Sequence, residues 1–224
     1  MEKTLTLNGL SLELAPGRLI ARFKQPQRML SWAIHGGGRA EGDTVVWQRV
    51  TAEDLRPGID PREFLRRKLE EESLVHAVGL LTSADISRFA EAEASYENLW
   101  AHAVVTAGVS NALRAGDPPG QGSDPGTINL LCAFSAPLSF EAHLEALAIA
   151  IEARTAAVLE AQIPSIQTSL PATGTGTDCA VMAAPRPSEA SQSVIYAGKH
   201  TAAGHLIGKA VFEAVRRALK LCID

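Results

Sequence analysis

The residues best suited to chemistry in this chain are small polar ones gathered around glycines. The densest group is Thr173-Gly-Thr-Gly-Thr-Asp178, which leads directly into the apolar residues 179–184. Glycines let backbone N–H groups approach a ligand oxygen closely, and threonine hydroxyls add further donors. Asp178 is either a base, the residue that orients a base, or the aspartate of a local turn. The run therefore predicts a loop that binds polar ligand atoms beside a carboxylate.

Two asparagines lie at the ends of other apolar segments. Ser110 and Asn111 follow residues 101–109, and Thr127 and Asn129 lie at the start of residues 127–134. Side-chain amides at strand ends either hydrogen-bond a ligand or form turns, and both interpretations stay open for Asn111 and Asn129.

Three further titratable residues are candidates for proton transfer. Glu152 lies beside the apolar stripe of a predicted helix, where it is either a general acid or base or the partner of a surface cation such as Arg154. His200 precedes the last predicted helix, where a neutral imidazole is favoured, and His35 adjoins three glycines. Each histidine is a candidate base or a structural residue. No ligand spacing joins His35, Asp178 and His200 into a metal site, so we predict none.

A serine-hydrolase pattern is also present. Gly108-Val-Ser-Asn-Ala112 differs by one residue from a nucleophile elbow around Ser110, and Asp178 and His200 or His205 follow in hydrolase order. An elbow needs a helix directly after its serine, but Pro118-Pro119 interrupts the chain there. We therefore favour a strand that ends in a polar turn. Cys179 opens an apolar strand with no histidine nearby in sequence, and we expect it to be a buried side chain.

The elements that must position these residues combine many strands with few helices. Strand patterns dominate the first third, and the amphipathic residues 139–160 and 201–221 predict two long helices. We predict an α+β fold, a single domain over residues 1–224 with a mixed β-sheet and two long helices packed on it; an α/β layered sandwich is the alternative. The predicted strands are residues 4–7, 10–14, 19–23, 29–35, 44–50, 75–81, 101–109, 127–134 and 179–184, and the short helices are residues 61–72 and 83–89, while residues 91–97 are too polar to assign.

Composition excludes several classes of protein. The chain has 224 residues, 46% of them hydrophobic, and a net charge of -4 without a basic run, so we expect no nucleic acid or membrane partner. Its three cysteines are far apart, which predicts no disulfide framework and a reducing compartment. Residues 1–14 read as a β-hairpin and not as a signal peptide, so we predict a cytoplasmic protein. A homo-oligomer is compatible with the sequence.

Five segments share a small, polar, Gly-rich or Ala-rich composition, namely Val105-Thr-Ala-Gly-Val-Ser-Asn-Ala112, Pro125-Gly-Thr-Ile-Asn129, residues 151–157, Thr173-Gly-Thr-Gly-Thr-Asp178 and Tyr196-Ala-Gly-Lys-His-Thr-Ala-Ala-Gly204. Taken together and in this order, they resemble the adenosylcobinamide amidohydrolase (CbiZ) family. Ile151-Glu-Ala-Arg-Thr-Ala-Ala157 is similar to the family's Glu-Ala-Lys segment, with Arg154 in place of lysine. Two neighbours of these segments also depart from the family: Ile151 replaces a small polar residue and Cys179 an alanine.

The resemblance implies a corrinoid-salvage enzyme. Such enzymes cut the amide that joins the corrin ring to aminopropanol, so that adenosylcobinamide gives adenosylcobyric acid and 1-amino-2-propanol. Cobalt belongs to the substrate, and no cofactor of the enzyme is expected. The alternatives are a non-catalytic corrinoid-binding protein and a Ser110-dependent hydrolase of another small amide.

Amide hydrolysis requires an activated water, donors for the oxyanion and a proton for the departing amine. We favour direct attack by water, with Asp178 or a histidine assisting. Trp32, Trp47 and Trp100 are either core residues or a surface for the ring. The predicted catalytic residues are Asp178, Glu152, His200 and His35, and the predicted substrate-binding residues are Ser110, Asn111, Thr127, Asn129, Thr173, Gly174, Thr175, Gly176, Thr177 and Thr201.

Overall fold

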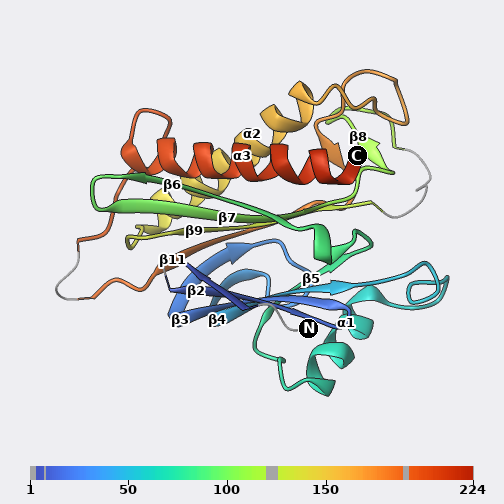
Figure 1. Ribbon diagram of the computed structural model, residues 1–224, viewed down its shortest axis with the longest axis horizontal. Helices are drawn as coiled ribbons and strands as arrows, with labels where there is room; N and C mark the ends of the chain where they lie inside the picture. Colours follow the sequence, from blue (N-terminus) through green and yellow to red (C-terminus); the bar gives the residue numbers. More distant parts are fainter. Residues whose placement is uncertain (1–3, 8, 120–125, 189–191, 224) are drawn as a thin grey trace.

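The protein is built from layers of helix, sheet, sheet and helix (Figure 1). This computed structural model describes residues 4–7, 9–119, 126–188 and 192–223. Its longer helices are α1 (Pro61–Glu71), α2 (Phe140–Glu160) and α3 (Ala202–Ile223). Its strands are β1 (Thr4–Leu7), β2 (Leu10–Ala15), β3 (Arg18–Ser31), β4 (Gly38–Arg49), β5 (Val78–Thr82), β6 (Ala90–Tyr96), β7 (Leu99–Ala107), β8 (Ala112–Leu113), β9 (Ile128–Phe134), β10 (Gly174–Thr175) and β11 (Cys179–Pro185).

One sheet that folds over on itself supplies both middle layers. Within the described residues it holds nine strands in the order β1-β2-β3-β11-β9-β7-β6, with β4 pairing β3 and β5. Strand β3 joins the two halves: residues 18–23 pair with β2 and residues 27–31 pair with β11, and its pairing with β4 shifts register between Arg22 and Gln27. The pairs β11–β9 and β4–β5 are parallel and the others are antiparallel, so the sheet is mixed.

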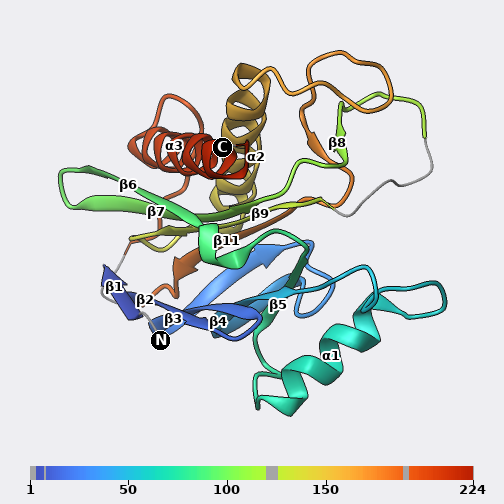
Figure 2. The same cartoon turned by 45° about the vertical axis from the view of Figure 1, so that its right-hand side comes forward.

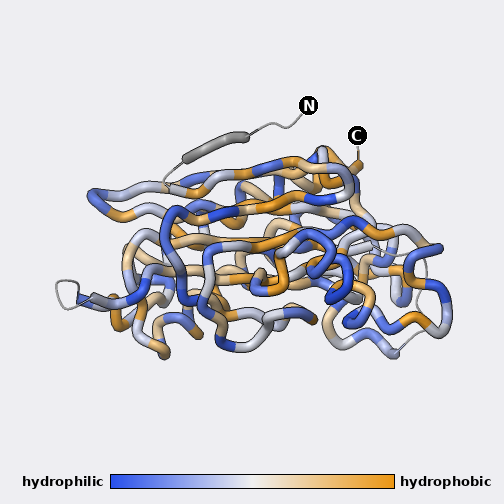
Figure 3. Tube along the Cα trace, turned by 90° about the horizontal axis from the view of Figure 1, so that it is seen from below, coloured by the Kyte–Doolittle hydropathy of each residue, from blue (hydrophilic) through white to orange (hydrophobic). Residues whose placement is uncertain are grey.

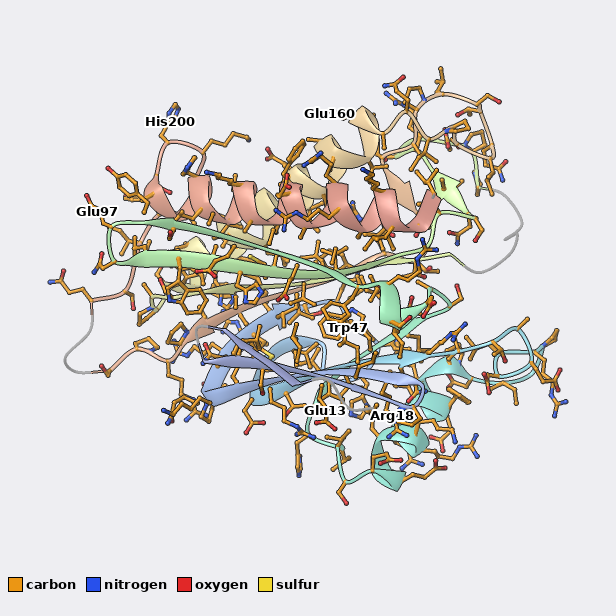
Figure 4. The ribbon with its side chains drawn as sticks, viewed as in Figure 1. Glu13, Arg18, Trp47, Glu97, Glu160 and His200 are labelled. Carbon is orange, nitrogen blue, oxygen red and sulfur yellow. The ribbon has the colours of Figure 1, made fainter. Side chains whose placement is uncertain are left out.

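Three clusters of buried apolar side chains in the described part of the chain hold the sheet between its helices. Between the two halves lie large apolar side chains such as Leu12, Leu131 and Trp47, the last of which is fully buried (Figure 4). Helices α2 and α3 cover the outer face of β6, β7, β9 and β11 (Figure 2). They pack on this face through many alanines. Alanine has no side chain beyond Cβ, so both helices can lie close to the sheet. The smaller α1 covers the other half through Leu65 and Leu69.

The predicted α+β fold with a mixed sheet and two long helices is confirmed. Two aspartates cap the short helices: Asp60 accepts a hydrogen bond from the Arg62 N–H at 2.9 Å at the start of α1, and Asp85 caps the 3-10 turn Ile86–Arg88. Hydrophobic and hydrophilic residues alternate along many of the strands (Figure 3). None of the helices in the described part of the chain is long and apolar enough to cross a membrane.

Several details differ from the sequence prediction: β4 begins at Gly38 and not at residue 44, β5 spans Val78–Thr82, the helix expected at residues 83–89 is only the 3-10 turn Ile86–Arg88, and the short strands β8 and β10 were not predicted. The segments 19–23 and 29–35 are not two strands, because β3 runs on through residues 24–28 and ends at Ser31. Residues 91–97 are too polar to assign from the sequence, yet residues 91–96 fall in β6, whose Ala90, Ala92 and Ala94 are buried against α3 while the residues between them are more exposed. A strand whose buried face is all alanine gives only a weak hydrophobic alternation.

Two glycines of α3 give a matched test of packing. An added Cβ at Gly204 would lie 2.2 Å from the Gly198 carbonyl oxygen, whereas at Gly208 the nearest atom, Cγ2 of Ile149, would be 3.6 Å away. We expect Gly204→Ala to lower the free energy of unfolding by about 1–3 kcal/mol, because backbone must move. Gly208→Ala should leave it unchanged or raise it by up to about 1 kcal/mol, because alanine favours helix. Urea denaturation measures both, and equal effects would contradict the packing argument.

Candidate active site

A cleft of about 470 Å³ lies at the end of the folded sheet where β9 and β11 begin. Strands β9 and β11 are parallel neighbours, and Asn129 is paired with Cys179. The residues just before each strand therefore meet at the same edge. Predicted site residues form the polar side of the cleft, namely Asn111, Thr127, Asn129, Thr177 and Asp178. The rest of the lining is largely apolar and includes Trp32, Ile34, Val50, Leu55 and residues 79–81 of β5.

Asp178 fixes the loop that precedes β11. Its Oδ1 accepts hydrogen bonds from the Ile128 N–H at 2.9 Å and from the Thr175 hydroxyl. Its Oδ2 accepts the Thr175 N–H at 2.9 Å and pairs with the guanidinium of Arg154 on α2. The two side chains of this ion pair are 7% and 12% exposed. Four donors on one carboxylate connect the loop to β9 and α2. Asp178 therefore fixes the positions of these three segments relative to one another.

The glycine of this loop that lies nearest to Asp178 is required by space. A Cβ on Gly174 would lie 2.3 Å from Oδ2 of Asp178 and 3.2 Å from the Arg154 guanidinium. The loop is also fixed from its other side, since Thr173 Oγ1 accepts the Ala115 N–H at 2.8 Å and β10 pairs with β8. A second hollow of about 320 Å³ lies along this loop and shares Trp32 and Asp178 with the cleft; Thr173, Gly174, Thr175 and Gly176 line it together with Arg114 and Arg154.

A short chain of hydroxyls lies between the two strand ends. Thr177 Oγ1 donates to the Gly126 carbonyl at 3.1 Å, and the Thr127 and Thr177 hydroxyl oxygens are 2.7 Å apart. Because the Thr177 proton goes to the carbonyl, the Thr127 hydroxyl is the donor to Thr177. The lone pairs of Thr127 are thereby left available to a ligand in the cleft.

Ser110 lies outside the cleft. It lines a third hollow of about 400 Å³ with Asp85, Arg88 and Cys222, and this hollow shares Ser83 with the cleft. Residues 110 and 111 form a turn followed by the two-residue strand β8. The helix that a nucleophile elbow needs does not follow Ser110, in agreement with our preference for a strand that ends in a polar turn.

Three other predicted residues lie at the opposite end of α3 from this third hollow. His200 is exposed beside the N-terminus of α3 (Figure 4), whereas Ala218 and Cys222 near its C-terminus line the hollow with Ser110. Thr201 caps α3, since its Oγ1 accepts the Gly204 N–H at 3.0 Å and donates to the Gly198 carbonyl. Glu152 pairs with Lys199, and the two side chains are 54% and 69% exposed. Glu152 thus has a surface cation as its partner, as one of the two interpretations expected, but this cation is Lys199, because Arg154 pairs with Asp178 instead.

His35 flanks the cleft without lining it. Its Nε2–H donates to the Val75 carbonyl at 2.8 Å, and its own carbonyl accepts the Gly79 N–H at 3.0 Å. These bonds attach the glycine-rich turn to the segment around β5. The catalytic assignments of Asp178, Glu152, His200 and His35 stay predictions, but of the four only Asp178 lines the cleft.

The sequence did not assign Arg154 to the site, nor Trp32 as a partner of Asp178. The Trp32 indole N–H donates to the Asp178 carbonyl at 2.8 Å, which places the half-exposed ring between the cleft and the second hollow. One feature of the sequence could have pointed to Arg154 as a site residue: it is the basic residue of a segment that resembles the family. Among the residues that the structure describes, no three His, Cys, Asp or Glu side chains are grouped as metal ligands.

Cys179 is a buried thiol of the cleft wall, as expected. Burial raises its pKa to about 11, and the burial of Cys132 raises that pKa to about 12. A thiol with this pKa is almost entirely protonated at neutral pH, so it is a poor nucleophile.

We therefore expect Cys179→Ala to change turnover less than about tenfold, whereas loss of a nucleophile costs several orders of magnitude. Alkylation of Cys179 by iodoacetamide should accelerate about tenfold per pH unit until pH 11, because the thiolate fraction rises in that proportion. Rate measurements on the wild type and Cys179→Ala test this. A thousandfold loss of turnover would instead make Cys179 the nucleophile.

A cleft with a largely apolar lining and a few polar groups at strand ends is typical of an enzyme that acts on a small molecule. The sequence model of the adenosylcobinamide amidohydrolase family matches residues 7–224, and the chain belongs to this family of amide-cleaving hydrolases. It is 30% identical over 195 residues to the adenosylcobinamide amidohydrolase of Methanosarcina mazei, covering 83% of this chain and 86% of the relative.

Two further similarities are lower in coverage or in identity. An uncharacterised protein of Methanocaldococcus jannaschii is 32% identical over 160 residues, which are 62% of this chain and 61% of that protein. Among solved structures, a Burkholderia sp. β-aminopeptidase is 13% identical and aligns with a TM-score of 0.47 over 93% of this chain and 80% of its own.

Proposed function

We propose that this enzyme hydrolyses the amide bond between the corrin ring side chain and aminopropanol in adenosylcobinamide. The water oxygen adds to the amide carbon, the C–N bond breaks, and the products are adenosylcobyric acid as a carboxylate and 1-amino-2-propanol as an ammonium ion. The named relative from Methanosarcina mazei and the family to which the chain belongs support this reaction. The cobalt of the corrinoid is part of the substrate.

The observation that carries the proposal is the row of adjoining hollows. The cleft shares Ser83 with one neighbour and Trp32 and Asp178 with the other. A corrinoid with its adenosyl ligand is much larger than a drug-sized molecule, and a cleft of about 470 Å³ takes in only one part of it. In this proposal the side arm with the amide enters the cleft, and the remainder of the substrate lies along the exposed Trp32 and the neighbouring hollows.

The polar side of the cleft supports a role in amide cleavage. Asn111, Thr127 and Asn129 offer hydrogen-bonding groups to the amide and to a water molecule, and Asp178 holds the loop of Thr175 and Thr177 against them. Direct attack by water is our preferred route. The side chain of Asp178 is saturated by donors in this arrangement, so we assign it first to positioning.

The test is to incubate the purified protein with adenosylcobinamide and to follow adenosylcobyric acid and 1-amino-2-propanol by mass spectrometry. Addition of hydroxylamine distinguishes the two routes, since an acyl-enzyme would give a hydroxamate and direct attack by water would not. A change in the corrinoid absorption spectrum without product would support the non-catalytic binding protein instead. Activity after treatment with a chelator tests the expectation that no metal cofactor is needed.

A further inference from the structure

Asn129 lines the cleft and carries a buried hydrogen-bond acceptor that has no partner among the described residues. Its side chain lies on β9 in a residue that is only 1% exposed, and its Nδ2 donates to the Leu81 carbonyl at 2.7 Å. A carbonyl can only accept, so the amide nitrogen must face Leu81 and the oxygen must face away. Oδ1 has no hydrogen-bond partner among the described residues. A buried acceptor without a partner is costly, so a donor from a ligand or from water is expected at this position.

The surroundings of Asn129 do not favour a negatively charged ligand. Asp178 is the only charged side chain among the described residues that line the cleft, and it is an anion. Burial keeps the neighbouring Cys179 thiol neutral by raising its pKa to about 11. The guanidinium of Arg154 lies in the second hollow and is paired with Asp178. A carboxylate that faced Asn129 Oδ1 would thus meet an acceptor and an anion with no lining cation.

We infer that Asn129 Oδ1 accepts the N–H of the substrate amide, and that the cleft thereby binds the amide and rejects the carboxylate product. This inference rests on the proposed function. Before hydrolysis a nitrogen with its proton faces Oδ1; after the C–N bond breaks, the nitrogen leaves with the amine and an oxygen of the carboxylate takes its place. A hydrogen bond is replaced by repulsion between two acceptors. Asn129 is therefore a residue that determines specificity and promotes product release.

The test compares two ligands that differ only at this group: adenosylcobyric acid and its primary amide, in which the same carboxyl group carries NH2. Equilibrium dialysis gives both dissociation constants from the visible absorption of the corrinoid, without any need for turnover. We expect the wild type to bind the amide about a hundredfold more tightly than the acid, since it gains a hydrogen bond and loses a repulsion. In Asn129→Ala this ratio should fall by about tenfold.

The matched control is Gln27→Ala. Gln27 is also a nearly buried amide whose nitrogen donates to a backbone carbonyl, that of Gln25 at 2.8 Å, but it is paired with Pro185 at the far end of β11 and does not line the cleft. Its replacement should leave the ratio of the two dissociation constants unchanged. If Asn129 had only a structural role, Asn129→Ala would raise the dissociation constants of both ligands by the same factor.

Two results would overturn the inference. One is equal binding of acid and amide by the wild type, which needs no variant and so does not depend on the folding of Asn129→Ala. The other is an unchanged ratio in Asn129→Ala. Failure of the proposed function is a separate result, namely no release of 1-amino-2-propanol from adenosylcobinamide; an enzyme that turns over normally but binds acid and amide equally would refute only the role of Asn129.

Discussion

Replacement of Arg154 by methionine is expected to lower the turnover of adenosylcobinamide about a hundredfold while the protein still folds. Arg154 comes from α2 and is the donor that connects this helix to the carboxylate of Asp178. Without it, Asp178 keeps the Ile128 and Thr175 donors, but the loop loses its attachment to the helix. A displacement of about 1 Å in a group that positions substrate is enough for a hundredfold loss.

The control for charge is Arg154→Lys. The family segment that this chain resembles has lysine at this position, so the conservative variant should recover most of the activity. The control for the loss of a surface ion pair is Arg216→Met, which removes a pair with Glu213 on the exposed side of α3 and should leave turnover unchanged. Equal activity of Arg154→Met and the wild type would contradict the positioning role.

A double-mutant cycle with Asp178→Asn separates positioning from independent chemistry. If both residues act by holding the same loop, the double variant should be no slower than the slower single variant, because the geometry is already lost. A multiplicative loss would show that Asp178 also has a role of its own, such as that of the predicted base. Removal of one partner of a buried ion pair costs about 3–5 kcal/mol of stability, so urea denaturation must accompany each rate.

The sequence predicted most of the fold because most strands carry large apolar residues. It divided β3 into two strands because the polar residues 24–28, Pro26 among them, stand between apolar segments. The sheet folds over on itself within these same residues, because β3 pairs with β2 before them and with β11 from Gln27 on. The polar residues mark the place, but they do not reveal that one strand continues through it. Strand β6 was not assigned from the sequence because its buried face consists of alanines, which give only a weak hydrophobic pattern.

The site was predictable only in part. Asp178, Thr127 and Asn129 were identified because each lies at the beginning of an apolar strand, and the parallel pairing of β9 and β11 then brings them together. His200 and Thr201 belong to an equally clear motif, but they lie at the N-terminus of the 22-residue helix α3. The third hollow, which adjoins the cleft, lies at the C-terminus of this helix. The contacts of Asp178 with Arg154 and Trp32 span 24 and 146 positions of the chain, respectively. Such contacts depend on tertiary packing, which spacing along one sequence does not reveal.

Replacement of Trp32 by alanine is expected to raise the KM for adenosylcobinamide at least about tenfold, because in the proposed function part of the corrinoid lies on this large flat ring. The residue is 47% exposed, which is unusual for tryptophan unless the ring has another partner. Its ring stands where the cleft meets the second hollow, held there by the bond from its indole N–H to the Asp178 carbonyl at 2.8 Å. Steady-state kinetics measure the effect on KM and on kcat separately.

Two variants show whether the ring or its N–H bond matters. Trp32→Phe keeps an aromatic surface but cannot donate to Asp178, so a normal KM with a lowered kcat would assign the N–H to loop positioning. Tyr96→Ala removes an exposed aromatic side chain at the end of β6, outside the described lining of the cleft, and should change neither constant. If Trp32→Ala leaves KM unchanged, the corrinoid does not lie on this ring. The substrate would then approach the cleft from the side of Ser83 and the third hollow, since that is the other hollow the cleft adjoins.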